Sequence, residues 1–138
     1  MDKKCKCGSL LENIKRSKCD DCRKGRRGLK WSEMLKIAEL QGNKCPLLGT
    51  PFEIREDKIM WTVLPGSKYK KKPTSVMIDH NHKTGLIRGL LSDMGNQLLG
   101  GFERGEYGQM TNEMPNTMKK YIERNYAYDI VGEREFQK

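Results

Sequence analysis

The sequence predicts an α+β protein, because the period of its apolar residues changes along the chain. Apolar side chains recur near a helical period over residues 29–41 and again over residues 116–126. Between these stretches, β-leaning residues at 75–80 and 86–91 flank the turn Lys83-Thr84-Gly85, as in a hairpin. A third observation is that four of the five cysteines lie within the first 28 residues. We therefore expect a Cys-rich N-terminal module, a mixed core and a C-terminal helix.

The N-terminal module, residues 1–28, carries two closely spaced cysteine pairs. They are Cys5-Lys6-Cys7-Gly8 and Cys19-Asp20-Asp21-Cys22, with few apolar residues around them. So little apolar surface does not fold unaided, whereas four thiolates suit a tetrahedral Zn²⁺ that contributes folding energy. The basic run that follows predicts that Arg26 and Arg27 contact nucleic acid. The predicted ligands of structural zinc are Cys5, Cys7, Cys19 and Cys22.

The central unit, residues 29–110, begins with a predicted amphipathic helix from Leu29 to Gln41. Ser32 is a suitable N-cap for it. Short strands or an irregular hairpin are expected over residues 45–64. Residues 65–73 are basic and bounded by prolines, which indicates an exposed loop.

The rest of the central unit is expected to run strand, turn, strand, helix. The strands cover residues 75–80 and 86–91. Ser92 or Asp93 then caps a helix that runs to about Leu99, and the Gly-Gly pair that follows closes it.

The last unit, residues 111–138, is expected to hold one further helix. Asn116 to Tyr126 places several apolar side chains on one helical face. The tail beyond Ile130 is polar, and we expect it to fray.

The charge balance indicates the class of partner. Lys and Arg outnumber Asp and Glu by 27 to 18, which gives a net charge of +9 at pH 7. Such an excess favours a polyanion, and double-stranded DNA is the partner we expect. No stretch is apolar and long enough to span a bilayer, and no apolar h-region follows the charged N-terminus. We therefore expect no membrane partner and a cytoplasmic protein, in the bacterial host cytoplasm if a phage encodes it.

Both histidines of the chain fall within Asp79-His80-Asn81-His82, at the end of a predicted strand. Hydrolysis of a phosphodiester requires a base near neutral pH, and imidazole titrates closest to that range. It also requires a cation to stabilise charge on the phosphate. Oxygen donors such as those of Asp79 and Asn96 suit Mg²⁺ or Mn²⁺. Because Asn96 lies about one turn inside the predicted helix, we expect it to face the same cation as Asp79.

The neighbouring residues have predicted roles and plainer alternatives. His80 would lie on the other face of an ideal strand from Asp79, but a frayed strand end lets its ring approach the same phosphate. The plainer alternatives are packing or surface histidines, a turn cap for Asp79, a helix hydrogen bond for Asn96 and a solvated lysine loop. His82 suits a structural or phosphate-binding role as well as catalysis. The residues expected to contact DNA are Arg88, His82, Lys83, Lys70, Lys71 and Lys72.

The run from Val76 to Leu91, followed by Asn96 and Gly100, resembles the phage recombination endonuclease VII branch of the HNH, or His-Me finger, nucleases. With Trp31, Gln41-Gly42 and Cys45 upstream, the resemblance covers roughly residues 30–102. It implies a ββα-metal core and cleavage that leaves a 5′-phosphate. It also implies that His80 is the general base and that Asp79 and Asn96 bind one divalent cation.

The chain departs from that family at several positions. The family usually has a zinc held by two CxxC pairs, but here these positions are Cys45 with Leu48 and Ser92 with Gly95, so we expect no zinc there and a buried Cys45. Leu99 stands near the position where the family has an acidic residue, and we expect no long C-terminal helical region of the kind that junction-resolving members carry. A nicking or homing-type HNH endonuclease is therefore expected. The alternatives are a non-catalytic zinc-stabilised DNA-binding module and a four-way-junction resolvase, and the chain is compatible with a monomer or a homodimer.

Overall fold

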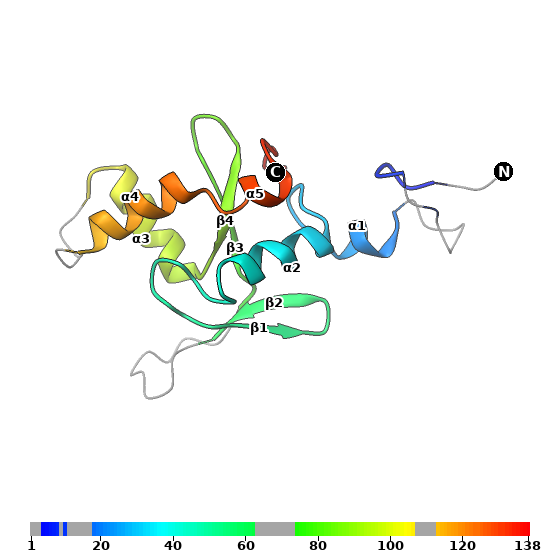
Figure 1. Cartoon of the computed structure of the whole chain (residues 1–138), viewed down its shortest axis with the longest axis horizontal. Helices are drawn as coiled ribbons and strands as arrows, with labels where there is room; N and C mark the ends of the chain where they lie inside the picture. The colour runs from blue at the N-terminus through cyan, green and yellow to red at the C-terminus, as the bar shows by residue number, and fades with distance from the viewer. Residues whose placement is uncertain (1–3, 9, 11–17, 63–73, 107–112) are drawn as a thin grey trace.

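The computed structural model describes residues 4–8, 10, 18–62, 74–106 and 113–138, and these residues mix helices with strands (Figure 1). The α+β prediction is therefore confirmed. In chain order, the elements are α1 (Asp20–Lys24), α2 (Trp31–Leu40), β1 (Phe52–Arg55), β2 (Lys58–Trp61), β3 (Met77–His80), β4 (Ile87–Leu91), α3 (Asp93–Glu103), α4 (Met114–Arg124) and α5 (Tyr128–Val131).

The described strands form two antiparallel hairpins that are joined through the backbone. β1 pairs with β2, and β3 pairs with β4. The N–H of Val76, just before β3, donates to the carbonyl of Ile59 in β2 at 2.9 Å. The N–H of Trp61 donates to the carbonyl of Thr74 at 3.0 Å, and the Trp61 indole donates to the Thr74 hydroxyl at 2.7 Å. The two hairpins therefore form one framework.

A β-bulge interrupts the β3–β4 ladder beside the paired histidines. Asp79 lies opposite Gly89, whereas the next residue, His80, lies opposite Ile87. Arg88 is therefore the extra residue on β4, without a partner across the ladder. Bulges bend a strand and change the direction of its side chains. At this point the two strands depart from the regular alternation of an ideal hairpin.

β4 lies between two hydrophobic cores, and all five of its residues are buried. Leu90 belongs to a first core with Ile37 of α2 and Trp61 of β2. Leu91 belongs to a second core with Leu99 of α3 and Met118 of α4. Because successive side chains of a strand point to opposite faces, one strand supports both cores. In Figure 1, α3 and α4 accordingly lie to the left of β4, and α2 lies to its right.

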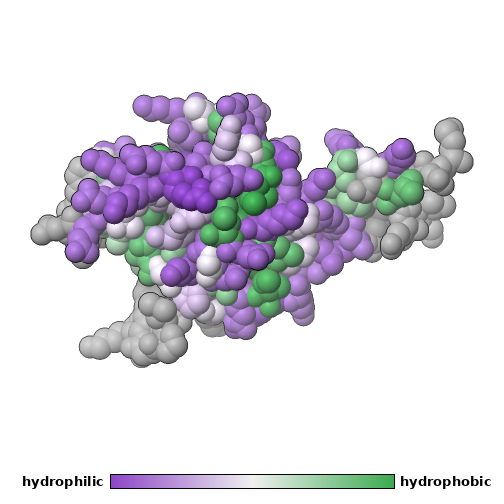
Figure 2. All heavy atoms as spheres, viewed as in Figure 1, coloured by the Kyte–Doolittle hydropathy of each residue, from purple (hydrophilic) through white to green (hydrophobic). Residues whose placement is uncertain are grey.

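The face of the molecule that Figure 2 presents is mostly polar. Figure 2 shows hydrophilic residues over most of the face that it presents, with hydrophobic residues in small separate patches. That face therefore offers no broad apolar surface for docking. None of the helices in the described stretches has the length and apolar character needed to cross a membrane.

Two helix boundaries differ from the predicted ones. α2 begins after Lys30, whose N–H donates to the Glu33 carboxylate at 2.9 Å. Ser32, the expected cap, instead lies in the first turn, and its N–H and hydroxyl both donate to Asp21 at 2.6 Å. α3 continues past the Gly-Gly pair expected to close it, because neither of those glycines has a positive φ. The next glycine, Gly105, does (φ 78°), and the helix ends just before it.

α4 confirms the predicted C-terminal helix, but the prediction of a frayed tail beyond it is wrong. The N–H of Ile87 donates to the carbonyl of Arg134 at 2.9 Å, and the N–H of Phe136 donates to the carbonyl of Gly85 at 2.8 Å. Further on, the N–H of Gln137 donates to the carbonyl of Arg27 at 2.9 Å. The edge of the β3–β4 hairpin offers unpaired backbone groups, which a polar segment can join as well as an apolar one. We call residues 134–138 the C-terminal segment.

Candidate active site and metal centre

One cavity collects residues from the end of β3 and along α3. It has a volume of about 720 Å³, and its lining includes Asp79, His82, Asn96 and Glu103. The structure thus brings together Asp79 and Asn96, which the sequence predicts as ligands of one cation. His80 does not line this cavity but a neighbouring one of about 490 Å³. His82 lines both, so it is the side chain that the two cavities share.

The face of α3 toward the larger cavity carries a residue that sequence reasoning missed. Asn96, Gly100 and Glu103 are spaced by four and three positions, which places them on one side of a helix. All three line the cavity, and Gly100 contributes no side chain between the other two. This helical spacing is the signal that could have found Glu103. Glu103 was missed because the helix was expected to end at about Leu99, which would leave Glu103 outside it.

Asp79 is buried and held by two partners. Its carboxylate accepts two hydrogen bonds from Arg88, from Nε at 2.9 Å and from Nη2 at 3.1 Å, and one from the Tyr121 hydroxyl at 2.8 Å. Burial raises the pKa of Asp79 above its ordinary value, and Arg88 and Tyr121 oppose that rise. Burial also raises the pKa of Tyr121, so its hydroxyl stays protonated as a donor. Tyr121 comes from α4, and no local pattern in the sequence points to it.

Arg88 faces the protein interior rather than a DNA phosphate, which corrects the expectation for this residue. Its side chain is only 5% exposed. Besides binding Asp79, Nη2 donates to a carboxylate oxygen of Glu103 at 2.7 Å and to the His80 carbonyl at 3.2 Å. The physical reason is that Arg88, the extra residue of the bulge, lies between two carboxylates that satisfy its charge. Arg88 therefore joins β3 to α3.

His80 is stacked between two aromatic rings. Its ring centroid lies 4.8 Å from that of His82 and 3.9 Å from that of Phe136, with interplanar angles of 15° and 16°. Two rings parallel to His80 at these distances would overlap if they shared one face, so they cover opposite faces. Burial and the neighbouring His82 lower the pKa of His80, against the effects of Asp79 and of a hydrogen bond to the Ile78 backbone. The imidazole is therefore neutral near neutral pH.

The turn between β3 and β4 presents a further predicted DNA contact. Lys83 is exposed there and lines the His80 cavity together with His82. Asn81 organises the turn, because its side-chain oxygen accepts the N–H groups of Lys83 (2.8 Å) and Thr84 (3.1 Å). DNA contact by His82 and Lys83 stays a prediction. The other predicted lysines, Lys70, Lys71 and Lys72, lie outside the described residues.

Cys45 is fully buried in the second core. A Cβ built on Gly95 would lie 2.8 Å from the Sγ of Cys45, so Gly95 has no room for a side chain. The Gly95 N–H donates to the Ser92 hydroxyl at 3.1 Å, and Leu48 packs against the same core. Close packing therefore brings together Cys45, Leu48, Ser92 and Gly95, the four positions that correspond to the two CxxC pairs of the family that the sequence resembles.

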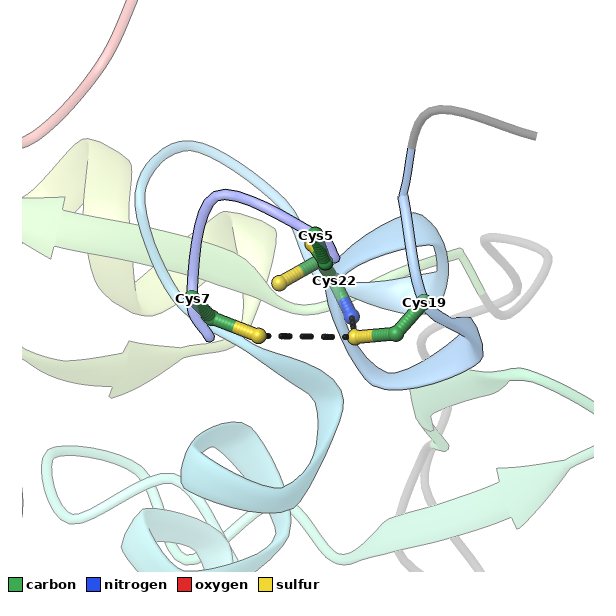
Figure 3. Close-up of side chains that lie close together, drawn as sticks. All are labelled: Cys5, Cys7, Cys19 and Cys22. Atoms are coloured by element: carbon green, nitrogen blue, oxygen red, sulfur yellow. Dashed lines mark hydrogen bonds between the residues drawn. The ribbon is translucent and has the colours of Figure 1, made fainter. Parts of the chain in front are cut away.

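The four N-terminal cysteines converge on one point (Figure 3). Their Sγ atoms all lie within 4.8 Å of one another, and those of Cys7 and Cys19 are 3.6 Å apart. Burial, followed by the neighbouring thiols, raises the pKa of Cys22 far above its ordinary value. A cation that accepts four thiolates would replace the protons crowded in this cluster. Cys5, Cys7, Cys19 and Cys22 could therefore hold a metal such as zinc.

Short contacts connect this cluster to the rest of the molecule. Cys19 is the N-cap of α1, and its Sγ accepts the N–H of Cys22 at 3.5 Å. Asp21, between them in sequence, accepts two hydrogen bonds from Ser32 of α2. A metal in the cluster would therefore fix the position of α1 against α2.

A basic cavity of about 550 Å³ lies beside the cysteine cluster. No acidic residue is found among the described residues that line it. Arg26 and Arg27, both predicted to contact DNA, are part of it, although Arg134 is already paired with Glu33 at 2.8 Å. The basic residues that line it are Lys6, Lys18, Arg26, Arg27, Lys30 and Arg134.

We expect elemental analysis of the purified protein to find about one zinc ion per chain. Cys19→Ser should remove most of that zinc, because three thiolates no longer close the tetrahedral site. Cys45→Ala is the matched control, since Cys45 lies in the second core, and it should keep the full zinc content. Zinc near zero in the wild-type protein would contradict the assignment.

Comparison with known proteins shows what the central segment is similar to. Residues 65–127 match the family model of recombination endonuclease VII. The chain is also 30% identical over 107 residues to the Gene 59 protein of Mycobacterium phage D29, in an alignment that covers 78% of this chain and 51% of that protein. The chain thus spans about half the length of that relative. No solved structure matches the chain. The resemblance carried by the paired histidines is confirmed, because residues 65–127 match the recombination endonuclease VII family.

Proposed function

We propose that this chain is a metal-dependent DNA endonuclease of the HNH, or His-Me finger, type and that it hydrolyses phosphodiester bonds. The observation that carries the proposal is the cavity in which Asp79 of β3 and Asn96 of α3 lie together, beside the cavity of His80. In this proposal β3, β4 and α3 form a ββα-metal core. The match to recombination endonuclease VII supports it, because all three elements lie within residues 65–127.

The oxygen donors of the larger cavity suit a hard divalent cation, Mg²⁺ or Mn²⁺. Asp79 and Asn96 would bind it, with Glu103 as a third donor from the same face of α3. Among the described residues, Oδ1 of Asp79 accepts a hydrogen bond from Arg88 alone. A second lone pair of this oxygen is therefore available to bind a cation. When bound, such a cation stabilises charge on the scissile phosphate and on the leaving oxygen.

His80 would be the general base. Its lowered pKa keeps the imidazole neutral near neutral pH, so that a ring nitrogen can accept a proton from the attacking water. The stacked rings of His82 and Phe136 cover its faces and leave its edge for that water. In the family that the sequence resembles, this chemistry leaves a 5′-phosphate, and we propose the same product here.

DNA binding by the basic residues is part of the same proposal. Of the described residues that line the cavity beside the cysteine cluster, six are basic and none is acidic, which suits a phosphate backbone. This observation also favours the second candidate function, a non-catalytic zinc-stabilised DNA-binding module. The third, four-way-junction resolution, draws support from the match to recombination endonuclease VII.

In a plasmid assay with Mg²⁺, we expect the wild-type protein to nick or cut supercoiled DNA. Loss of a general base typically lowers a rate by about 100-fold to 10,000-fold, so His80→Ala should lose cleavage and keep its affinity for DNA. Tyr128→Ala, at an exposed position of α5 that lines neither cavity, is the control and should cut normally. Wild-type protein that binds DNA and never cuts it would support the binding module. Strong preference for a four-way junction over linear duplex would support the resolvase.

The cleavage rate should fall on the acid side of neutrality as His80 takes up a proton, because a protonated imidazole cannot accept one from water. Since the pKa of His80 lies below the ordinary value of 6.5, the midpoint of this decline should lie below pH 6.5. A profile of single-turnover rate against pH tests this. An acid limb centred at or above 6.5 would contradict the assignment of His80 as the base.

DNA affinity should depend less on salt when two charges of the basic cavity are removed. Each phosphate contact contributes about 0.9 to the slope of log K against log salt, so Lys6→Gln with Lys18→Gln should lower that slope by about one to two. The matched control is Lys36→Gln with Lys58→Gln, two exposed lysines of α2 and β2. Zinc content verifies that the double variant keeps its cysteine site. An equal change in slope for both pairs would count against the basic cavity as a DNA surface.

A further inference from the structure

The C-terminal segment places one aromatic side chain directly on the proposed catalytic histidine. Phe136 stacks on His80 with a centroid separation of 3.9 Å and an interplanar angle of 16°. It also lines the smaller cavity beside His80. Nothing in the local sequence around either residue brings them together. The contact exists because the C-terminal segment joins the edge of the β3–β4 hairpin.

Backbone hydrogen bonds of Phe136 itself and of the residues before and after it fix its position. Its own N–H donates to the carbonyl of Gly85, while Leu86 and Glu135 form an antiparallel bridge. On the far side, the N–H of Gln137 donates to the carbonyl of Arg27. The ring position is therefore set by the backbone and does not depend on the side-chain stack alone.

Arg134 anchors the start of the same segment. Its guanidinium donates two hydrogen bonds to the Glu33 carboxylate of α2, at 2.8 and 2.9 Å, in a bidentate pair. It also donates to the carbonyl of Gly28 at 2.9 Å. A Cβ built on Gly28 would lie 2.7 Å from the carbonyl oxygen of Glu135, so the two segments are in close contact. Bidentate contacts between arginine and a carboxylate fix the relative orientation of the two side chains in addition to pairing their charges.

A phenyl ring can orient the His80 imidazole without blocking the nitrogen that accepts a proton. It limits rotation of the imidazole by contact with one face, while His82 limits it on the other. Unlike a polar neighbour, it neither donates to nor accepts from the ring nitrogens, so it does not compete for the lone pair that takes the proton. Small errors in the position of a reacting group can slow a reaction by about 100-fold.

We propose that Phe136 is a positioning residue for His80 and that the C-terminal segment is an integral part of the proposed nuclease site. This inference rests on the proposed function, in which His80 is the general base. Phe136 acts through His80 and does not itself take part in proton transfer.

The test compares Phe136→Leu with Phe136→Tyr. Leucine removes the flat ring while keeping an apolar side chain, and tyrosine keeps the ring. Under single-turnover conditions with Mg²⁺ and a duplex substrate, Phe136→Leu should lower the cleavage rate by about 10-fold to 100-fold with little change in DNA affinity. Phe136→Tyr should restore most of the rate. Phe52→Leu, the same change at a partly buried position packed against the two cores, is the matched control and should cut normally.

A second measurement is independent of cleavage. The chain has two histidines, so the imidazole carbon-bound protons give few NMR signals. The Phe136 ring should shift the His80 signals upfield, and this shift should disappear in Phe136→Leu and persist in Phe136→Tyr and Phe52→Leu. Thermal melting shows whether each variant is folded.

The outcomes are distinct. A normal or increased rate in folded Phe136→Leu would overturn the positioning role, and an increase would mark the segment as a cover that hinders His80. If the ring-current shift is absent from the wild-type protein, the stack does not exist in solution and the inference fails. If His80→Ala still cuts DNA, the proposed function fails instead, whatever the Phe136 variants do.

Discussion

The buried ion pair between Asp79 and Arg88 is the interaction on which the proposed active site depends. It joins β3 to β4, and the Arg88 guanidinium extends the connection to Glu103 of α3. Tyr121 of α4 binds the same carboxylate. Removing one partner of such a pair leaves an uncompensated buried charge, at a cost of about 3–5 kcal/mol. Four elements are thereby held around one carboxylate, whose orientation is fixed from two directions, as a metal site on rigid elements requires.

The two chemical functions of the proposed site occupy adjacent cavities because of how β3 ends. Asp79 lines the cavity that also holds Asn96, whereas the next residue, His80, lines the cavity that holds Phe136. His82 borders both cavities, so a phosphodiester bound over His82 would be in reach of the oxygen donors on one side and the imidazole on the other. The bulge at the end of the β3–β4 ladder is what allows neighbouring residues to serve both cavities.

Segments from both ends of the chain add contacts that stabilise the small core. Few apolar side chains are buried among the described residues of the N-terminal module, where the four cysteines instead converge on one point that could hold a metal. The C-terminal segment returns to the same region, where Gln137 binds Arg27 and Arg134 binds Glu33. The basic cavity beside the cysteines and the cavity beside His80 consequently share this segment as a common wall, since Gln137 lines one and Phe136 the other.

The sequence by itself determined the features that arise from local spacing. These are the α+β class, the hairpin about the Lys83-Thr84-Gly85 turn, the cysteine cluster and the placing of Asp79 with Asn96, because each depends on residues a few positions apart or on one short hairpin and helix. Only the tertiary structure decided the direction of Arg88 and the stacking of Phe136 on His80. The physical reason is that a bulge and a strand-edge pairing are set by contacts between distant parts of the chain, which leave no periodic signal in the sequence.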